Sequence, residues 1–465
     1  LMLKPGIEIS IEAPEVLLHH DKGGGLEAHI AFRQSGEVVE RVYFRISQSS
    51  PVAPPVVADV ALPLAVPLAM RLRCSLRFAE PVSRRLLEGA RKFQEIFSVW
   101  YPDFQPVPIH APAAEGDTPV RDSRGVGVFF SGGLDSSYSL LKHCEEVTHA
   151  IFIHGCDIKL ENTAYRDRAV RRLRETAESC GAELVEVETD LLRCSDEICE
   201  WGKHYHGSAM VAIAMLLSGT LRKVYLASST SYLRIVPWGS SAVTDPLWTT
   251  PYLEVVHDGA EAERLEKARR IVESPEALRN LRVCFETPDG GYNCGRCEKC
   301  YRTMVALRIC GALDDCAAFD RPLDLDAMVE HPEVIEKFGR LRSWITSGQC
   351  ARDAGVDREL VAALEELSRR SSSRDLVRKL ATEKYDIVAS PHWRASLPKF
   401  RSALFNSLRE EDPEWFTAKV MKWLPAERDE AFTRLAEYDR PWFKRRFWRY
   451  RWSRLLKKLR PFRGA

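Results

Sequence analysis

Between Val126 and about residue 320, short apolar runs alternate with longer segments whose apolar residues recur every three or four positions. The short runs predict buried strands, and the longer segments predict helices that pack on a sheet. The predicted strands are Val126–Phe130, His149–Ile153, Glu183–Val187 and Lys223–Ala227, and the predicted helices lie near Ser136–Cys144, Ala164–Cys180 and Ser208–Leu221. This alternation is typical of α/β proteins, so we expect a Rossmann-like parallel sheet that binds ligands at the carboxyl ends of its strands.

The residues on either side of this region show different patterns. The N-terminal residues predict a small β-rich unit with one helix, because three alternating or β-branched runs precede a segment of helical period. The runs are Ile7–Ile11, Leu26–Phe32 and Val39–Ile46, and the helix is Val82–Trp100. Prolines and small residues between Gln105 and Arg124 predict a linker, and the strand signal fades after the central region. We therefore expect a β-rich domain at 1–110, a central domain at 124–325 and an α-helical C-terminal region at 326–465.

Composition narrows the class of protein. Of the 465 residues, 45% are hydrophobic, and the formal net charge is +1. These values exclude a wholly disordered chain and a uniformly basic nucleic-acid binder. No apolar run approaches the roughly 20 residues that a transmembrane helix needs. The chain has 13 cysteines and no recognisable secretion signal, so we expect a cytoplasmic protein whose clustered thiolates bind metal.

The charge is distributed unevenly along the chain. Residues 440–465 contain 11 Lys or Arg and no Asp or Glu, so the remaining residues sum to −10. Aromatic and basic residues are interleaved in this tail from Trp442 to Trp452. Such a segment can dock on an acidic protein surface, bind nucleic acid or lie on an anionic membrane, and the sequence leaves these three roles open.

The first motif with chemical meaning follows the first predicted central strand and precedes a helix. Its residues are Ser131, Gly132, Gly133, Leu134, Asp135, Ser136 and Ser137. The two glycines let backbone amides turn towards an anion, and the helix adds the positive end of its dipole. The serine hydroxyls can donate to phosphate oxygens, and the carboxylate can bind a Mg²⁺ ion that bridges them. The alternative is an ordinary glycine turn with serine caps; the string lacks the Gly-Lys-Ser/Thr of a Walker A loop.

The second motif is a group of four cysteines, of which the last three have the spacing Cys-x-x-Cys-x-x-Cys. They are Cys284, Cys294, Cys297 and Cys300. Four thiolates so close in sequence suit one tetrahedral Zn²⁺ and leave no coordination position for water, so we expect a structural zinc site. An iron–sulfur cluster also takes four cysteines, and a disulfide with free thiols is a further alternative.

The Ser-Gly-Gly-x-Asp-Ser string resembles the signature of the PP-loop ATP pyrophosphatases, which have an adenine nucleotide alpha hydrolase-like fold. Members of that family bind ATP, cleave it between the α- and β-phosphates and leave AMP on a substrate oxygen. The resemblance implies that Ser131, Gly132, Gly133, Asp135 and Ser136 hold the pyrophosphate and its Mg²⁺. ATP, Mg²⁺ and Zn²⁺ are thus the expected cofactors.

The two motifs together resemble the 7-cyano-7-deazaguanine synthases of the queuosine pathway. The similar string is Cys-x9-Cys-Gly-x-Cys-x-x-Cys-x-Arg, which ends here at Arg302, and the resemblance covers about 200 of the 465 residues. Those enzymes adenylate the carboxylate of 7-carboxy-7-deazaguanine, add ammonia and dehydrate the amide to a nitrile with ATP. Similar proteins with added domains occur in bacterial anti-phage defence operons, where a deazaguanine is coupled to the amino terminus of a partner protein.

The resemblance therefore implies an ATP-dependent C–N ligase that acts on a deazapurine-like carboxylate, with ammonia or a protein or peptide amine as acceptor. Two other functions stay open. A PP-loop enzyme that modifies tRNA would use the basic tail at 440–465 to hold RNA. A non-catalytic nucleotide-binding module is disfavoured by the intact Ser-Gly-Gly-x-Asp-Ser string.

Weaker candidates lie near the ends of the other predicted strands. His154 and Asp157 follow the second strand, where PP-loop enzymes place their adenine and ribose contacts, and the alternative is a simple turn that ends the strand. Arg302 could face the phosphates or the substrate carboxylate, or it could be a helix residue in a salt bridge. Three segments with small polar or imidazole groups could contact phosphate or a flat heterocycle: His204–Gly207, Ser228–Thr230 and Gly239–Asp245. The alternatives are a helix cap for the first segment and solvated loops for the other two. Arg264 and Lys267 are interpreted as part of a solvated helical face.

Overall fold

The computed structural model describes residues 3–11, 15–19, 25–47, 57–114, 124–195, 197–284, 291–338, 342–353 and 357–382. The chain divides into two units, Leu1–Leu323 and Asp324–Ala465, so the C-terminal boundary falls close to the expected one. Within the described residues, no helix combines the length and apolar character that a membrane span requires.

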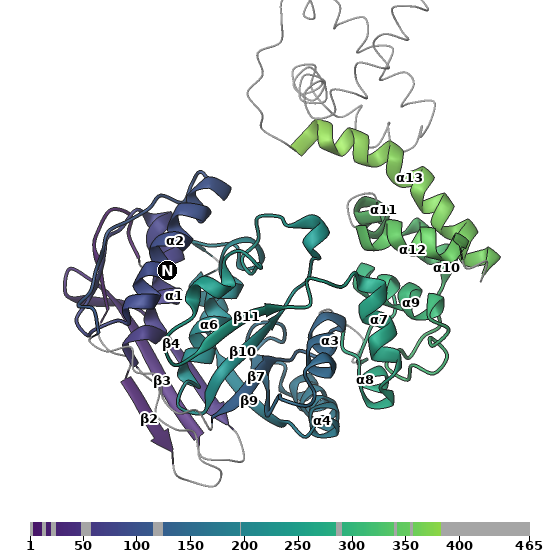
Figure 1. The fold of residues 1–465 in the computed structure, drawn as a ribbon. Helices are drawn as coiled ribbons and strands as arrows, with labels where there is room; N and C mark the ends of the chain where they lie inside the picture. The colour runs from purple at the N-terminus through teal and green to yellow at the C-terminus, as the bar shows by residue number, and fades with distance from the viewer. Residues whose placement is uncertain are drawn as a thin grey trace, which may run out of the picture. The chain divides into compact units, whose positions relative to one another are not determined.

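The first unit is an α/β structure built on a single mixed, mostly parallel sheet (Figure 1). Its strands are β1 (Ile9–Ile11), β2 (Glu15–His19), β3 (Gly25–Gln34), β4 (Glu37–Ser47), β5 (Leu76–Phe78), β6 (Ile109–His110), β7 (Gly125–Phe129), β8 (His149–His154), β9 (Glu183–Thr189), β10 (Leu221–Ala227) and β11 (Glu254–Asp258). They lie in the order β11-β10-β7-β8-β9-β4-β3-β1-β5-β6, and β2 pairs with β3.

The central part of the sheet agrees with the sequence prediction. The four predicted strands are confirmed as β7 to β10, and β11 adds a fifth strand; all neighbouring pairs among these five are parallel. The three predicted helices are α3 (Leu134–Lys142), α4 (Thr163–Ser179) and α6 (His206–Leu216). Because β7 lies between β8 and β10, the chain leaves it in one direction for β8 and β9 and returns on the other side for β10 and β11. Ligands of doubly wound sheets bind at such a reversal of strand order.

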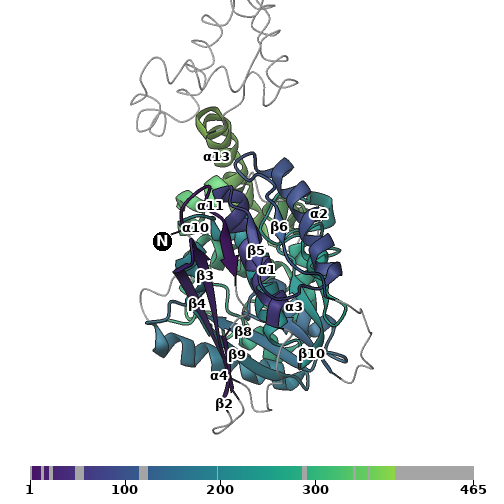
Figure 2. The same ribbon diagram turned by 90° about the vertical axis from the view of Figure 1, so that its left-hand side faces the viewer.

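The N-terminal residues, expected as a separate β-rich domain at 1–110, extend this same sheet. Strand β4 pairs antiparallel with β9, with Phe44 opposite Thr189, so the sheet is continuous from the central strands into the N-terminal ones (Figure 2). The expected linker contains β6 and an isolated parallel bridge between Val82 and Ala113. Residues 115–123 of that linker lie outside the described residues.

Two layers of helices cover the sheet (Figure 1). The layer that contains α6 also contains α1 (Val57–Leu72) and α2 (Arg84–Trp100), and α2 confirms the predicted N-terminal helix. The layer that contains α3 and α4 also holds the later helices of the unit. These are α7 (Arg264–Val272), α8 (Pro275–Arg279) and α9 (Glu298–Ile309). The remaining short elements are α5 (Leu191–Ser195), a π-helical turn η1 (Trp201–Tyr205), and the 3₁₀ turns η2 (Tyr232–Arg234) and η3 (Asp245–Trp248).

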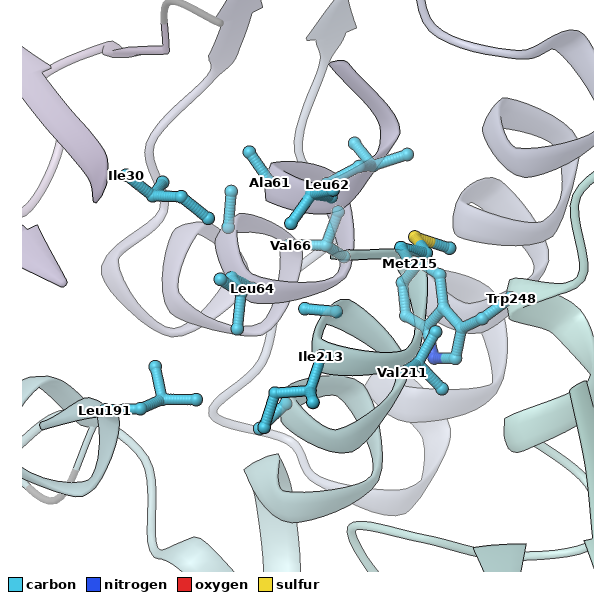
Figure 3. Close-up of a cluster of buried hydrophobic side chains, with 14 of the residues drawn as sticks. Ile30, Ala61, Leu62, Leu64, Val66, Leu191, Val211, Ile213, Met215 and Trp248 are labelled. Carbon is cyan, nitrogen blue, oxygen red and sulfur yellow. The ribbon is translucent and has the colours of Figure 1, made fainter. Parts of the chain in front are cut away.

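Helix α1 forms much of the core and is not predicted by the sequence pattern. It contains Pro63 and Pro67, each of which removes a backbone donor, yet its side chains from Val60 to Met70 are almost completely buried. Figure 3 shows α1 packed against α6, with Ile213 beside Leu64. Apolar burial on all sides of the helix offsets the lost hydrogen bonds and explains why no amphipathic period marks it.

The second unit is helical in its described part. Its helices are α10 (Leu325–Glu330), α11 (Pro332–Phe338), α12 (Arg342–Asp353) and α13 (Arg358–Thr382). Phe338 and Trp344 pack with ring centroids 5.9 Å apart, and Leu360, Leu364 and Leu367 of α13 are buried. The expected helical region at 326–465 therefore begins as predicted. Everything after residue 382, including the basic tail, lies outside the described residues.

Candidate functional site

The Ser131–Ser137 segment, called the glycine loop below, connects the carboxyl end of β7 to the first turn of α3. Gly132 has φ +74°, a conformation that L side chains rarely adopt, and a Cβ there would lie 2.5 Å from Leu173 Cδ2. Gly133 is the N-cap of α3 and has an extended backbone. The segment predicted to cradle phosphate therefore has the strand–turn–helix context that the prediction requires, and the positive φ favours glycine at position 132.

Hydrogen bonds within the glycine loop hold its serines at the start of the helix. The Ser136 hydroxyl accepts from the Ser131 amide at 3.2 Å and lies 3.3 Å from the Ser131 hydroxyl. The first amides of an α-helix have no intrahelical acceptor, so those of Leu134, Asp135 and Ser136 can donate to an anion at this end.

Two cationic side chains of α7 converge on Asp135. Lys267 Nζ donates to Asp135 Oδ1 at 2.9 Å and to the Ser228 carbonyl at 2.6 Å, and Arg264 Nη1 lies 4.0 Å from Asp135 Oδ2. The Lys267 side chain is only 2% exposed, whereas that of Asp135 is 28% exposed. The interpretation of Arg264 and Lys267 as a solvated helical face was wrong, because both side chains point inwards to the glycine loop.

The charges of Lys267 and Arg264 determine the protonation state of Asp135. Burial raises the pKa of Asp135, but the positive charges of Lys267 and Arg264 outweigh burial and hold that pKa below its ordinary value. Asp135 is therefore ionised at neutral pH. Burial, together with the charge of Arg302, lowers the pKa of Arg264 to about 10, and its Nε is buried without a hydrogen-bond partner among the described residues. A concentration of partly uncompensated positive charge of this kind favours an anionic ligand.

Arg282 connects the glycine loop to the turn that follows β8 and was not singled out from the sequence. Its Nε donates to the Ser131 carbonyl at 2.9 Å, its Nη2 donates to Asp157 Oδ2 at 3.1 Å, and its backbone amide donates to the Gly132 carbonyl at 2.8 Å. The Arg282 side chain is 1% exposed, and its Nη1 has no partner among the described residues. Asp157, predicted as a ligand contact, is thus brought next to the glycine loop.

The other two predicted contacts lie in different surroundings. Arg302 Nε lies 3.1 Å from Glu298 Oε1 within α9, and the charge of Arg302 acts on both Asp135 and Arg264. His154 is buried: its Nε2 donates to the Lys159 carbonyl at 3.1 Å, and its Nδ1 makes no hydrogen bond within the described residues but lies 3.7 Å from Glu188 Oε2. The structure therefore brings Arg302 towards the cationic group, whereas both ring nitrogens of His154 face oxygen atoms of the protein.

The four cysteines come together as a compact group. The sulfur atoms of Cys284, Cys294, Cys297 and Cys300 all lie within 4.8 Å of one another. The Cys284–Cys297 and Cys294–Cys300 sulfur pairs are both 3.8 Å apart. Zinc–sulfur bonds of about 2.3 Å in a regular tetrahedron place sulfur atoms about 3.8 Å apart. The group could therefore hold a metal ion such as zinc, and the donor set fits one four-coordinate ion.

Asn293 holds the cysteine-bearing segments in place. Its Oδ1 accepts from the amides of Val283 and Cys284 at 2.9 and 3.1 Å, and its Nδ2 donates to the carbonyls of Leu281 and Ala318 at 2.9 and 2.8 Å. Because Arg282 belongs to the same short segment, the cysteine group and the glycine loop are mechanically connected. The intervening residues 285–290 lie outside the described residues.

Gly155 begins the turn between β8 and Asp157, and we predict that replacing it with alanine destabilises the protein. Its φ is +105°, and a Cβ would lie 1.9 Å from the Thr189 carbonyl oxygen. The backbone would have to move, and we expect a loss of about 3 kcal/mol or more in the free energy of unfolding. Gly181→Ala is the matched control, since Gly181 has φ +67° but open space at the Cβ position, and about 1 kcal/mol is expected there. Equal losses for the two variants in urea unfolding would contradict the close contact.

The remaining predicted segments also gather at this edge. Ser228, Gly239 and Asp245 belong to the long connection that follows β10, and His206 begins α6. Strands β10 and β8 are the two parallel neighbours of β7, so the segments after their carboxyl ends flank the glycine loop. The three roles left open for the tail at 440–465 concern residues outside the described part of the chain.

Comparisons with protein-family models, with curated proteins and with solved structures found no match to this chain. Its function is therefore inferred from the chemistry of its own residues.

Proposed function

We propose that this protein is an ATP-dependent enzyme that adenylates a carboxylic acid and then joins the acyl group to a nitrogen nucleophile. One observation carries the proposal: a Ser-Gly-Gly-x-Asp-Ser turn at the amino end of α3 is surrounded by Lys267, Arg264, Arg282 and Arg302. Triphosphate carries several negative charges, and this arrangement offers helix amides, hydroxyls and guanidinium groups to them.

The residues of the loop fit a nucleotide and its cation in distinct roles. The amides after Gly133 and the hydroxyls of Ser131 and Ser136 would bind the pyrophosphate end. Asp135 is ionised and has the most exposed side chain of its ion-pair group, so it is the residue that would hold Mg²⁺. Bound Mg²⁺ supplies neutralisation of charge on the phosphate oxygens.

The reaction proceeds in two steps. A carboxylate oxygen of the acid attacks the α-phosphorus of ATP, the bond to the bridging oxygen of the β-phosphate breaks, and pyrophosphate leaves. The uncharged nitrogen then attacks the acyl carbon, AMP leaves with the electron pair of the carbon–oxygen bond, and the nitrogen releases a proton to water. Cations around the glycine loop favour the first step because they stabilise the leaving pyrophosphate.

A deazapurine acid such as 7-carboxy-7-deazaguanine is the substrate we propose, and the acceptor is ammonia or a protein or peptide amine. This choice is supported by the combined motifs: Arg282 joins the glycine loop to a segment that continues directly into the four-cysteine group. The alternative of tRNA modification depends on the tail at 440–465, which lies outside the described residues.

The test is a single incubation followed by two measurements. The full chain is mixed with ATP, Mg²⁺ and 7-carboxy-7-deazaguanine, with and without ammonium, and AMP and pyrophosphate release are followed together with the mass of the acid product. We expect acid-dependent release of both and a product lighter than the acid when ammonium is present. Release of ADP and phosphate, or no nucleotide binding at all, would refute the proposal.

A further inference from the structure

The outermost strand of the sheet, β6, has one unpaired edge. It pairs with β5 on its inner side, and an isolated bridge between Val82 and Ala113 continues this pairing. The amides of Leu76 and Val82 donate to the carbonyls of Pro108 and Pro112, both at 2.9 Å. Successive residues of a strand direct their backbone groups to opposite sides, so the residues that alternate with these prolines face away from β5. The outward residues are Ile109, Ala111 and Ala113.

None of these three outward residues has a backbone hydrogen bond within the described part of the chain. The two prolines, which have no amide to donate, stand at inward positions, so the outward edge keeps all its donors. The preceding amide, that of Val107, donates to Gln94 Oε1 at 2.7 Å. At the other edge of the sheet, the amide and the carbonyl of Val255 both bond to Thr249 Oγ1. The edge at 109–113 therefore differs from the edges that the protein closes with its own side chains.

A cavity of about 440 Å³ opens beside this edge. Strands β1, β5 and β6 are parallel to one another, and the cavity is lined by residues at or near their carboxyl ends. In α/β sheets, ligands bind at the carboxyl ends of parallel strands. Because β4 is antiparallel to β9, β3 to β4 and β1 to β3, these three strands run against the central ones. The cavity therefore lies at the opposite end of the strands from the glycine loop and is a separate site.

Three polar side chains stand in one row at the cavity. Ser10 on β1 is opposite Arg77 on β5, and Arg77 is opposite His110 on β6. Glu8 accepts from Nε and Nη2 of Arg77 at 2.7 and 3.1 Å, so Nη1 stays unused within the described residues. In the same part of the chain, the Ser10 hydroxyl and the His110 ring make no hydrogen bond, and the Arg77 side chain is 57% exposed. The row thus offers a hydroxyl, a guanidinium N–H and an imidazole to a carboxylate.

We infer that β6 binds an extended acidic segment of a partner protein as an added strand, with an acidic side chain next to the row of Ser10, Arg77 and His110. Unpaired backbone donors and acceptors at strand spacing are matched by another strand and not by a compact ligand. A partner residue opposite His110 extends the row by one strand, which places its side chain beside the cavity. The inference is independent of the proposed function, because it uses no residue of the glycine loop.

The test selects phage-displayed random octapeptides on the immobilised full chain and measures the affinity of the enriched peptides by fluorescence anisotropy. We expect peptides that carry an acidic residue and bind with micromolar dissociation constants. Ala111→Pro removes an outward amide that makes no hydrogen bond within the described residues, and it should weaken binding by about 10-fold or more. Ala111→Ser is the matched control, since it keeps the amide and should bind as the unaltered protein does. Arg77→Gln should weaken binding by about 3- to 10-fold through loss of the guanidinium.

Methylation of the peptide backbone tests the added strand without any change in the protein. Two versions of an enriched peptide carry N-methyl groups on the two complementary sets of alternate amides, and only one set can face β6. One version should therefore lose binding, and the other should keep it. Equal effects of the two versions, no enriched peptide, or unchanged affinity in Ala111→Pro would overturn the inference. A dimer of the unaltered chain that Ala111→Pro dissociates, seen by sedimentation, would also overturn it, because a second copy would then occupy the edge.

Discussion

Replacing Asp135 with asparagine is expected to lower Mg²⁺-dependent release of pyrophosphate by about 100-fold or more. The amide keeps the shape of the side chain but removes the charge that we assign to Mg²⁺, and it leaves Lys267 and Arg264 facing an uncharged group. Release is measured at saturating ATP and acid, and at several Mg²⁺ concentrations. The deficit should persist at the highest of these, because a neutral amide is a poor ligand for this ion.

Asp258→Asn is the matched control for a loss of charge on a neighbouring element. Asp258 is buried and accepts from Ser139 at 2.6 Å, from Lys142 at 2.8 Å and from His143 at 2.9 Å, all on or next to α3. Its replacement should reduce the free energy of unfolding while the remaining folded protein still releases pyrophosphate. Normal turnover by Asp135→Asn, or equal losses of activity in both variants, would contradict the assignment of Asp135.

The strands around the site could be predicted from the sequence because parallel strands covered on both faces are nearly continuous apolar runs. In β7, four of five residues are buried, and the run stands out from its surroundings. Strand β11 has the sequence Glu-Val-Val-His-Asp, with polar residues at both ends, and was missed. Its position is set by pairing with β10, which depends on tertiary structure and leaves no local pattern.

The extent of the first unit could not be predicted for a related reason. The pairing of β4 with β9 places Phe44 opposite Thr189, which is far away in the sequence. No local pattern in either strand indicates which strand it pairs with. The N-terminal runs could therefore be predicted as strands but not as part of the central sheet. Helix α1 was missed for a different reason. A helix that is buried on all sides has no polar face, so its sequence lacks the alternation of apolar and polar residues that predicts a helix.

The site separates in the same way into local and distant parts. The glycine loop and the cysteine group are contiguous strings whose spacing carries their chemistry, so both could be found in the sequence. Lys267 and Arg282 reach the glycine loop from segments more than a hundred residues away, as their contacts with Asp135 and Ser131 show. The sequence of α7 does contain a pattern that could have indicated Lys267. Leu265, Ala268 and Ile271 are buried, and Lys267 is buried with them. A buried lysine needs an oppositely charged or hydrogen-bonding partner.

Removal of the metal ion is the second change with a large expected effect. We expect the purified chain to carry one zinc ion and neither iron nor acid-labile sulfide, because the 3.8 Å sulfur separations fit a single ion. Cys297→Ser should lose the ion and reduce the free energy of unfolding by about 3 kcal/mol or more, since the ion joins segments on both sides of residues 285–290. Metal content is measured by mass spectrometry and stability by urea unfolding.

The same variant should also lose pyrophosphate release, because Cys284 follows Arg282 by two residues and Arg282 holds the Ser131 and Gly132 carbonyls. Cys316→Ser is the control: Cys316 is buried but lies outside the group, and its thiol donates to the Leu278 carbonyl at 3.2 Å, a bond that serine can keep. That variant should retain zinc and activity. Iron with labile sulfide in the purified protein, or full zinc content in Cys297→Ser, would show that the four sulfurs do not bind one ion. Loss of zinc without loss of activity would instead show that the glycine loop keeps its conformation independently of the metal.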